Sequence, residues 1–369
     1  MKRILFLTTS LGFGGAEKML TYVANQLCLR GHSVGIINLN SVPGYLNQHK
    51  QILNNQIEVF NVFNKNSGLK RYRDDLMDSL KYAKKFAPDV MIGFAERPNL
   101  LAKLISDIIK KPSIMSERGD PNRTNGRRGI SNKIVAHIID QSNGGVFQTD
   151  GAQKFFGKKL QKKSVIIPNP IFIDSEFEYK AIESEKIVVS VGRLDNEQKR
   201  YDIMLKAFKE FYKKHSEYSL YIYGDGSDKD QIKKMIDDSN LNECVILKGV
   251  SNNPVRDITG ARMFLITSDY EGISNSLLEA MAVGLPCVST DHTPGGARLL
   301  IQDHENGLLA PIGDYMKIAD CMCEFVENPL LADRCGKNAK NVQIRFEPKR
   351  IIDMWEDYIM KVCEEQHGN

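Results

Sequence analysis

Short apolar runs alternate with stretches of helical periodicity along most of this 369-residue chain. In the first half, apolar runs bounded by turn residues predict strands over 3–8, 33–38, 89–93, 113–116 and 144–147. The second half repeats the pattern, with strands predicted over 186–191, 219–223, 244–248, 263–267 and 286–289. Amphipathic helices are predicted between them, for example over 15–30, 69–86, 201–214 and 274–283. Strands that alternate with helices are typical of parallel sheets, so the pattern predicts two α/β domains in series.

The segment over 166–186, "IIPNPIFIDSEFEYKAIESEK", interrupts this pattern. Its prolines, Pro168 and Pro170, break any regular element, and a polar stretch follows them. We therefore expect an N-terminal domain over 1–170 and a second domain over 171–345. Residues 346–369 are set apart because one long amphipathic helix is predicted to begin just after Pro348.

Composition is ordinary for a globular protein, with 42% hydrophobic and 26% charged residues. The N-terminal apolar run, Ile4 to Leu7, is too short for the core of a secretion signal, and no stretch approaches the roughly 18 apolar residues of a membrane span. We expect a cytoplasmic protein. The seven cysteines form no CxxC pair and no cluster with histidine, which favours a reducing compartment and predicts no metal site.

The net charge of +4 conceals an asymmetry between the two halves. Residues 1–172 hold 26 Lys and Arg against 12 Asp and Glu, a net of +14, and the remaining residues hold 24 against 34, a net of −10. Such a basic half predicts contact with an anionic partner, for which nucleic acid, an anionic membrane surface and a phosphorylated substrate are the alternatives.

Ligands of open α/β sheets bind beyond the carboxyl ends of the strands, so the turns that follow strands are the places to search. After the first strand, "TTSLGFGGAEKML" places Gly12, Gly14 and Gly15 before a helix, where free N–H groups can meet an anion. A dinucleotide fingerprint would need a third glycine where this chain has Glu17. The alternative is a tight turn that only packs.

In the second half, "VSVGRLDNEQKR" runs from a strand into Gly192 and Arg193, with Lys199 and Arg200 at the next helix. Because helix starts favour acidic residues, these cations predict a diphosphate site, and a solvated basic helix start is the alternative.

The next such turn is "YGDGSDKD", in which Gly224 ends a strand. Its Asp228 and Asp230 form a DxD, a pattern that can bind a divalent metal. Their place in the first helical turn favours a simple interaction with the helix dipole instead.

The stretch "DYEGISNSLLEAMAVGLP" follows a further strand and carries two carboxylates eight residues apart, Glu271 and Glu279. Small polar residues between them predict a helix N-terminus that can receive an anion. We interpret the carboxylates as two grips on the hydroxyl groups of one extended ligand. A dipole charge at Glu271 and a solvated charge at Glu279 are the alternatives, although the apolar residues after Glu279 favour a partnered carboxylate.

Together these segments resemble the GT-B glycosyltransferases, and most closely glycosyltransferase family 4. The motifs that carry the resemblance across nearly the whole chain are the E-x7-E of Glu271 and Glu279, "SVGRLDNEQKR", "YGDGS", Gly14-Gly15, "IPNP" and "GGARLLIQDHENGLLAP". The resemblance implies two Rossmann-like domains that face a central cleft, with a C-terminal helix that crosses back to the first domain. The first domain would bind the acceptor, and the second would bind a nucleotide-sugar donor.

The resemblance also implies a role for each motif residue. Arg193 and Lys199 would neutralise the leaving diphosphate in place of a metal, and Glu271 would bind the donor sugar. Glu279 would bind the ribose, and the main chain at Gly249-Val250 would face the base. The implied donor contacts are completed by Gly14, Gly15, Gly192, Arg200, Gly224, Gly272, Asn275, Ser276 and Leu277. A retaining reaction is implied, with a UDP-sugar as co-substrate, no bound cofactor and no metal.

Two departures from the family pattern affect these roles. Relatives often have four residues between the phosphate-binding Arg and Lys, whereas five separate Arg193 from Lys199, so Lys199 and Arg200 could share the role. Many relatives carry a histidine after the strand near residue 116, where this chain has Glu117 and Arg118. We expect these two side chains to contact the acceptor or the donor sugar.

Two basic segments of the first half, "QKFFGKKLQKK" over 153–163 and "NRTNGRRGISNK" over 122–133, suit contact with an anionic leaflet. A transferase acting on a polyprenyl-diphosphate-linked glycan, as in capsule or O-antigen synthesis, would use such a surface at the inner face of the cell membrane; a solvated helix face is the alternative. No nucleic-acid module is present. The competing functions are a catalytically silent sugar-nucleotide-binding subunit and a nucleotide-sugar hydrolase or epimerase.

Overall fold

The computed structural model describes residues 1–12, 15–39, 53–63, 66–124, 130–173, 179 and 184–366. Its contacts divide the chain into two compact units, one made of Met1–Asn169 with Lys349–Asn369 and the other of Pro170–Pro348. The boundaries expected from the sequence fall after residues 170 and 345. Among the described residues, no helix combines the length and the apolarity needed to cross a membrane.

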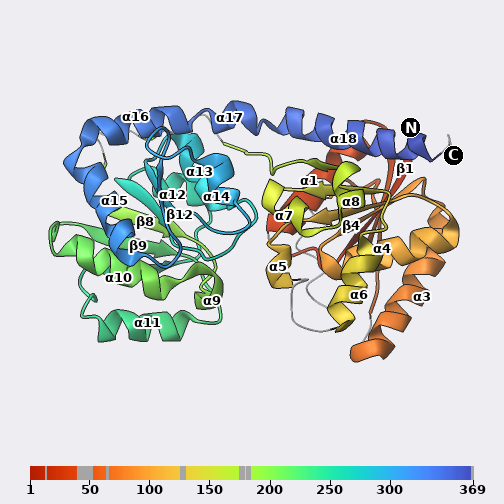
Figure 1. Ribbon diagram of the computed structural model, residues 1–369, viewed down its shortest axis with the longest axis horizontal. Helices are drawn as coiled ribbons and strands as arrows, with labels where there is room; N and C mark the ends of the chain where they lie inside the picture. The colour runs from red at the N-terminus through yellow and green to blue at the C-terminus, as the bar shows by residue number, and fades with distance from the viewer. Residues whose placement is uncertain are drawn as a thin grey trace. The chain divides into compact units, whose positions relative to one another are not determined.

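The first unit is built on a seven-stranded parallel sheet in the order β3-β2-β1-β4-β5-β6-β7. Its strands β1 and β4 are labelled among the helices of the unit in Figure 1. Its strands are β1 (Arg3–Thr8), β2 (Ser33–Asn38), β3 (Glu58–Asn61), β4 (Val90–Phe94), β5 (Ser113–Glu117), β6 (Gly144–Phe147) and β7 (Ser164–Ile166). The sequence pattern misses only the two edge strands, β3 and β7, which are short and incompletely buried. Edge strands lack the continuous apolar run of a strand that is buried on both faces.

Alternate side chains of β1 pack into two separate cores on opposite faces of this sheet. Ile4 and Phe6 pack with residues of α1 (Gly15–Leu29) and α18 (Pro348–Glu365). Leu5 and Leu7 pack with residues of α3 (Gly68–Phe86) and α4 (Glu96–Ile109). The remaining helices of the unit are α5 (Pro121–Thr124), α6 (Ile130–Ile139), α7 (Asp150–Phe155) and α8 (Lys158–Lys162).

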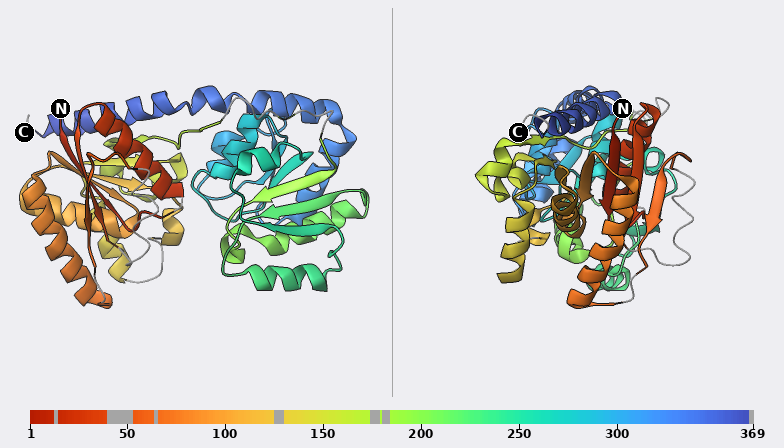
Figure 2. Two further views of the ribbon diagram at one scale, coloured as in Figure 1. Left: turned by 180° about the vertical axis from the view of Figure 1, so that it is seen from behind. Right: turned by 90° about the vertical axis from the view of Figure 1, so that its right-hand side faces the viewer.

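The last helix, α18, returns to the first unit, as the GT-B resemblance implies (Figure 2). Its Trp355 is fully buried and stacks on Phe94 with ring centroids 5.6 Å apart. The Tyr358 hydroxyl accepts a hydrogen bond from the N–H of Gly145 at 2.8 Å. The C-terminal helix is therefore part of the first core, although the chain reaches it only after completing the second unit.

The second unit has a six-stranded parallel sheet in the order β10-β9-β8-β11-β12-β13. Its strands are β8 (Ile187–Val191), β9 (Ser219–Tyr223), β10 (Val245–Gly249), β11 (Met263–Ile266), β12 (Cys287–Thr290) and β13 (Leu308–Ala310). Its helices are α9 (Asn196–Lys199), α10 (Tyr201–Tyr212), α11 (Lys229–Asp238), α12 (Pro254–Ile258), α13 (Asn275–Val283), α14 (Gly296–Leu300), α15 (Tyr315–Glu327), α16 (Pro329–Ala339) and α17 (Val342–Arg345). The short strand β13 is absent from the sequence-based expectation.

Both sheets reverse their strand order next to the first strand of the unit, at β1/β4 and at β8/β11. In open α/β sheets the crevice beyond the carboxyl ends at such a switch point is the usual ligand site. The topology of the second unit therefore directs attention to the turns after Val191 and Ile266.

Candidate active site

Two glycine pairs let the main chain come unusually close at the carboxyl edge of the second sheet. A Cβ added at Gly224, whose φ is +144°, would lie 1.8 Å from the carbonyl oxygen of Gly192. A Cβ added at Gly296 would lie 1.6 Å from the carbonyl oxygen of Gly272. Only glycine fits such approaches, so the turns after neighbouring strands form one continuous edge.

The switch point brings together Lys199, at the end of α9, and Glu271, in the turn after β11. The Lys199 ammonium forms an ion pair and hydrogen bond with Glu271 Oε1, and the two side chains are only 13% and 11% exposed. The same oxygen accepts a hydrogen bond from the Ser268 hydroxyl at 2.9 Å. The backbone N–H of Glu271 donates to the carbonyl of Thr293 at 2.7 Å, which fixes the turn.

This environment keeps Glu271 ionised at neutral pH. Burial alone would raise the pKa of its carboxyl group, but the charge of Lys199, the nearby His292 and the hydrogen bonds from Lys199 and Ser268 hold that pKa below its ordinary value. An ionised carboxylate only accepts hydrogen bonds, so Glu271 suits the hydroxyl groups of a polyol.

His292 lies behind this ion pair and is fully buried. Burial lowers the pKa of its imidazole, Glu271 raises it and Lys199 lowers it, with a net decrease, so the ring is neutral at pH 7. Within the described part of the chain, neither ring nitrogen meets a hydrogen-bond partner in good geometry. The sequence motifs do not include His292, although its position two residues after β12 was a signal that could have found it.

The two arginines of this region are in different states. Arg200 donates to both oxygens of Asp202, at 2.9 and 3.0 Å, and to Asp269 at 2.8 Å. The hydrogen bonds to Asp202 and Asp269 raise the pKa of Arg200 although burial lowers it. Arg193 has a 66% exposed side chain that contacts Asp195 and Gln198 at 3.2 and 3.1 Å. Arg193 is thus the arginine whose guanidinium is open to a ligand.

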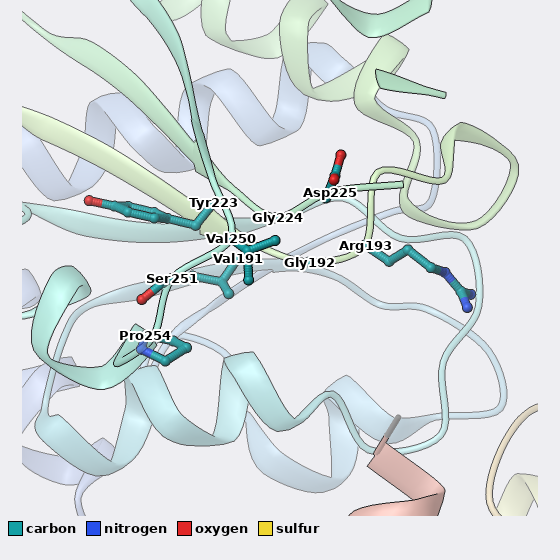
Figure 3. A pocket seen from close by; sticks show the side chains of 9 residues that line it. All are labelled: Val191, Gly192, Arg193, Tyr223, Gly224, Asp225, Val250, Ser251 and Pro254. Atoms are coloured by element: carbon teal, nitrogen blue, oxygen red, sulfur yellow. The ribbon is translucent and has the colours of Figure 1, made fainter. Parts of the chain in front are cut away.

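A pocket of about 240 Å³ opens beside Gly192 (Figure 3). It is lined by Val191, Gly192, Arg193, Tyr223, Gly224, Asp225, Val250, Ser251 and Pro254. In Figure 3 the Arg193 side chain extends on the side of the pocket opposite Tyr223 and Pro254. The strand ends at Gly192 and Gly224 thus bound a mainly apolar recess with a cation at one end.

Helix α13 begins at the same edge of the sheet. Ser274 caps it by accepting a hydrogen bond from the N–H of Leu277 at 3.5 Å, and its hydroxyl lies 3.2 Å from that of Ser276. Asn275 and Glu279 are both partly buried on this helix. Asp228 of the DxD accepts from the N–H of Asn196 at 2.7 Å, which is an ordinary helix-start contact.

The remaining predicted residues belong to the first unit. Gly14 lies outside the described residues, and Gly15 begins α1. Glu117 is 3% exposed, and burial raises its pKa to about 7 although the N–H groups of Gly119 and Arg118 donate to it and lower it.

Arg118 lies next to this carboxyl group and binds the last residues of the Met1–Asn169 part of the first unit. It donates to the carbonyl of Ile167 at 3.3 Å and to Asn169 Oδ1 at 2.5 Å, and burial lowers its pKa to about 9. These contacts secure the segment that leads to the second unit. A ligand role for Glu117 or Arg118 stays a prediction.

Comparison with known proteins finds a family match within the second unit. Residues 172–342 match the family described as "Glycosyl transferases group 1". A poly(ribitol-phosphate) alpha-N-acetylglucosaminyltransferase of Staphylococcus aureus is 33% identical over 227 residues, covering 61% of this chain but only 45% of that protein.

Two further matches extend over nearly the whole chain. The N-acetylgalactosamine-N,N'-diacetylbacillosaminyl-diphospho-undecaprenol 4-alpha-N-acetylgalactosaminyltransferase of Campylobacter jejuni is 28% identical, covering 95% of this chain and 97% of that protein. The structure of Anabaena HepE in complex with UDP and glucose superimposes with a TM-score of 0.82 at 17% identity, covering 98% of this chain and 100% of that one. These findings support a glycosyltransferase with the GT-B fold.

The ion pair itself yields a stability prediction. We expect Lys199→Met to lower the free energy of unfolding by about 3 kcal/mol, because Glu271 is left charged and buried. The double variant Lys199→Met/Glu271→Gln should lose at least about 1 kcal/mol less unfolding free energy than the two single variants lose in sum. Urea denaturation of the four proteins measures this coupling, with Lys206→Met, at an exposed position of α10, as the matched control.

The coupling should also depend on pH. The folded pKa of Glu271 is lowered from its ordinary value of 4.5, so the stabilisation is present above pH 4.5 and is lost as the pH falls through the folded pKa. Additivity of the two changes within about 0.3 kcal/mol at pH 7 would contradict this account of the pair.

Proposed function

We propose that the protein is a retaining glycosyltransferase that transfers a sugar from a UDP-sugar to a polyprenyl-diphosphate-linked glycan in the synthesis of a bacterial surface polysaccharide. The observation that carries the proposal is the Lys199–Glu271 pair at the β8/β11 switch point, next to the pocket beside Gly192. A sugar diphosphate has an anionic diphosphate and a sugar with several hydroxyl groups. The Lys199 ammonium suits the first, and the ionised Glu271 carboxylate suits the second.

The donor would lie along the carboxyl edge of the second sheet. Its base would occupy the recess lined by Val191, Val250 and Pro254, and its diphosphate would meet the open guanidinium of Arg193. Lys199 would exchange its bond to Glu271 for the phosphate oxygens. Glu271 would then accept hydrogen bonds from hydroxyl groups of the sugar.

The rest of the donor would contact α13 (Asn275–Val283). Backbone N–H groups at its start would approach the phosphates, as anions favour helix N-termini. Glu279, about one turn further along, would accept hydrogen bonds from the ribose hydroxyls. Arg200, already bound to Asp202 and Asp269, would hold the turn of Lys199 in place rather than contact phosphate.

Chemically, the bond between the sugar C1 and the diphosphate oxygen breaks while the acceptor hydroxyl oxygen bonds to C1 on the same face. The hydroxyl proton passes to the leaving phosphate oxygen, so atoms and charges balance without a protein nucleophile. Lys199 and Arg193 would stabilise the charge that develops on the leaving group, the task that a metal performs in other transferases. Positioning of the acceptor hydroxyl next to C1 would supply much of the remaining rate enhancement.

The lipid-linked acceptor is suggested by two independent observations. The name of the Campylobacter jejuni relative describes an undecaprenol-linked acceptor, and the match covers 97% of that protein. The first half of this chain carries a net charge of +14 over 1–172, which suits a diphosphate headgroup in an anionic leaflet.

A donor panel tests the enzymatic proposal. We expect release of UDP from one UDP-sugar in the presence of EDTA, and not from GDP- or ADP-sugars, with turnover strongly increased by a lipid-linked oligosaccharide. Glu271→Ala and Lys199→Ala should each lower kcat by about 10²–10³-fold, as when one transition-state contact is removed. Lys206→Ala is the matched control and should keep its activity.

The controls separate the competing functions. Turnover that is independent of any acceptor would indicate a hydrolase or epimerase, and tight nucleotide binding without turnover on any acceptor would indicate a silent subunit. Full activity in both the Glu271 and Lys199 variants would refute the site assignment. The anomeric configuration of the product, read by NMR, tests retention.

The proposed membrane contact is electrostatic. Phe156 and Leu160 of the segment over 153–163 are buried in a core with Phe147, so they are not free to insert into a bilayer. The lysines of the segment remain at the surface, for example the exposed Lys158 and Lys159.

We therefore expect the protein to pellet with anionic liposomes at low salt and to be largely released at 0.5 M salt, where the Debye length falls to about 4 Å. Neutral liposomes are the control. Failure to pellet with anionic liposomes at low salt would contradict the proposed membrane contact.

A further inference from the structure

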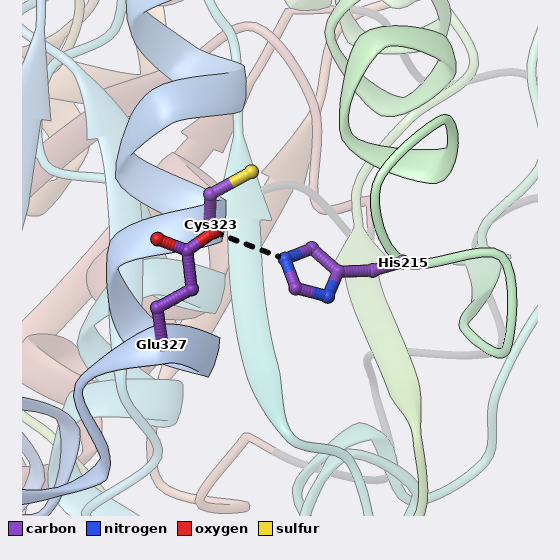
Figure 4. Close-up of side chains that lie close together, drawn as sticks. All are labelled: His215, Cys323 and Glu327. Carbon is purple, nitrogen blue, oxygen red and sulfur yellow. Dashed lines mark ion pairs between the residues drawn. The ribbon is translucent and has the colours of Figure 1, made fainter.

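Three potential metal ligands from two distant parts of the sequence meet at the far end of α10 in the second unit. His215 lies in the turn after α10 (Tyr201–Tyr212), and Cys323 and Glu327 lie on α15 (Tyr315–Glu327). Figure 4 shows the imidazole directed from its turn toward the side chains of the helix. Because Cys323 and Glu327 are four residues apart, they share one face of α15.

The distances are close to those of a tetrahedral site. One ligand atom from each residue lies within 4.8 Å of the others, and His215 Nε2 is 3.5 Å from Glu327 Oε1. Zinc bonds of about 2.0–2.3 Å place tetrahedral ligand atoms roughly 3.3–3.8 Å apart. The imidazole and carboxylate already satisfy this spacing, and the thiol has to approach by up to about 1.5 Å, which rotation of the Cys323 and Glu327 side chains can supply.

The imidazole is held in place by its surroundings. Its ring lies 5.1 Å from the ring of Phe211 and 6.2 Å from that of Tyr218. Its Nε2 atom is buried and, among the residues that the structure describes, has no hydrogen bond of good geometry. A buried ring nitrogen without a hydrogen bond is costly, and a metal ion would satisfy it.

The charges also suit a divalent cation. With the thiol deprotonated, Cys323 and Glu327 supply two negative charges and His215 a neutral nitrogen, so a divalent ion is neutralised. Asp320 adds a negative charge near Cys323, and Lys214 adds a positive one. Burial raises the pKa of the Cys323 thiol, so metal binding would have to release its proton.

We propose that His215, Cys323 and Glu327 form a zinc site that cross-links the end of α10 to α15. Thiolate, imidazole and carboxylate are the ligand types that zinc accepts, and the exposed Glu327 side leaves a fourth position for water. The site lies about 18 Å from Lys199, the length of the 12-residue α10. The site is therefore separate from donor binding, and its proposed role is to hold the end of α10 to α15.

Metal titration of the chelator-stripped, full-length protein tests the proposal. We expect one Co²⁺ per chain, a thiolate charge-transfer band in the near ultraviolet, and displacement of Co²⁺ by one equivalent of Zn²⁺. Cys323→Ser should abolish the band. Glu327→Gln should weaken Zn²⁺ binding at least about tenfold, at or beyond the effect of losing an outer-shell partner.

Cys321→Ser is the matched control, because Cys321 is an equally buried thiol two residues away that does not belong to the cluster. It should bind both metals like the wild type. Glu327 is 61% exposed, so its variant keeps the proposal testable if Cys323→Ser fails to fold. Absence of Co²⁺ and Zn²⁺ binding by the wild type, or unchanged binding by Glu327→Gln, would overturn the site. Because UDP release and metal binding are read separately, failure of the zinc site leaves the proposed transferase activity intact, and the reverse also holds.

Discussion

The contact between Lys199 and Glu271 is the interaction on which the account of this protein depends. It joins the turn after β8 to the turn after β11, and those strands are neighbours only because the sheet reverses its order there. A largely buried ion pair contributes little net stability, since the cost of removing both charges from water offsets their attraction. Its value lies in holding a cation and an ionised carboxylate ready at one edge, where a sugar diphosphate would need both.

The rest of the edge is arranged around this contact. Arg200 adopts a left-handed conformation between α9 and α10, and its bonds to Asp202 and Asp269 tie the Lys199 turn to the turn that carries Glu271. The close approach of Gly224 to Gly192 keeps side chains away from the entrance of the neighbouring pocket. Lys199 and Glu271 are thus fixed by main-chain geometry and by other charges, which prepares the site before any ligand arrives.

Much of the fold follows from the sequence because parallel strands buried on both faces are nearly continuous apolar runs. β1, β2 and β6 match their predicted bounds. The edge strands β3 and β7 are incompletely buried and β13 has only three residues, so none of the three gives a clear apolar run. The C-terminal helix is equally visible from its pattern. Its burial of Trp355 against Phe94 joins positions more than 250 residues apart, and periodicity does not encode such contacts.

The sequence motifs single out candidate site residues but not their arrangement. The motifs identify Arg193, Lys199 and Glu271 as candidates, yet their spacing does not reveal that Lys199 pairs with Glu271 while Arg200 binds Asp269. His292 was missed because a single histidine after a strand is weak evidence. The cluster of His215 and Cys323 was missed for a related reason, since 107 residues separate the two ligands in the sequence.

The central claim is that Lys199 leaves Glu271 for the donor diphosphate, and UDP binding measured by isothermal titration calorimetry tests it most directly. Glu271→Gln should bind UDP about tenfold more tightly than the wild type, a gain of roughly 1.4 kcal/mol, because Lys199 no longer has to break an ion pair. The same change in a Lys199→Met background should bring no gain, which separates this effect from simple relief of charge repulsion. Unchanged or weaker UDP binding by Glu271→Gln, or an equal gain without Lys199, would contradict the account.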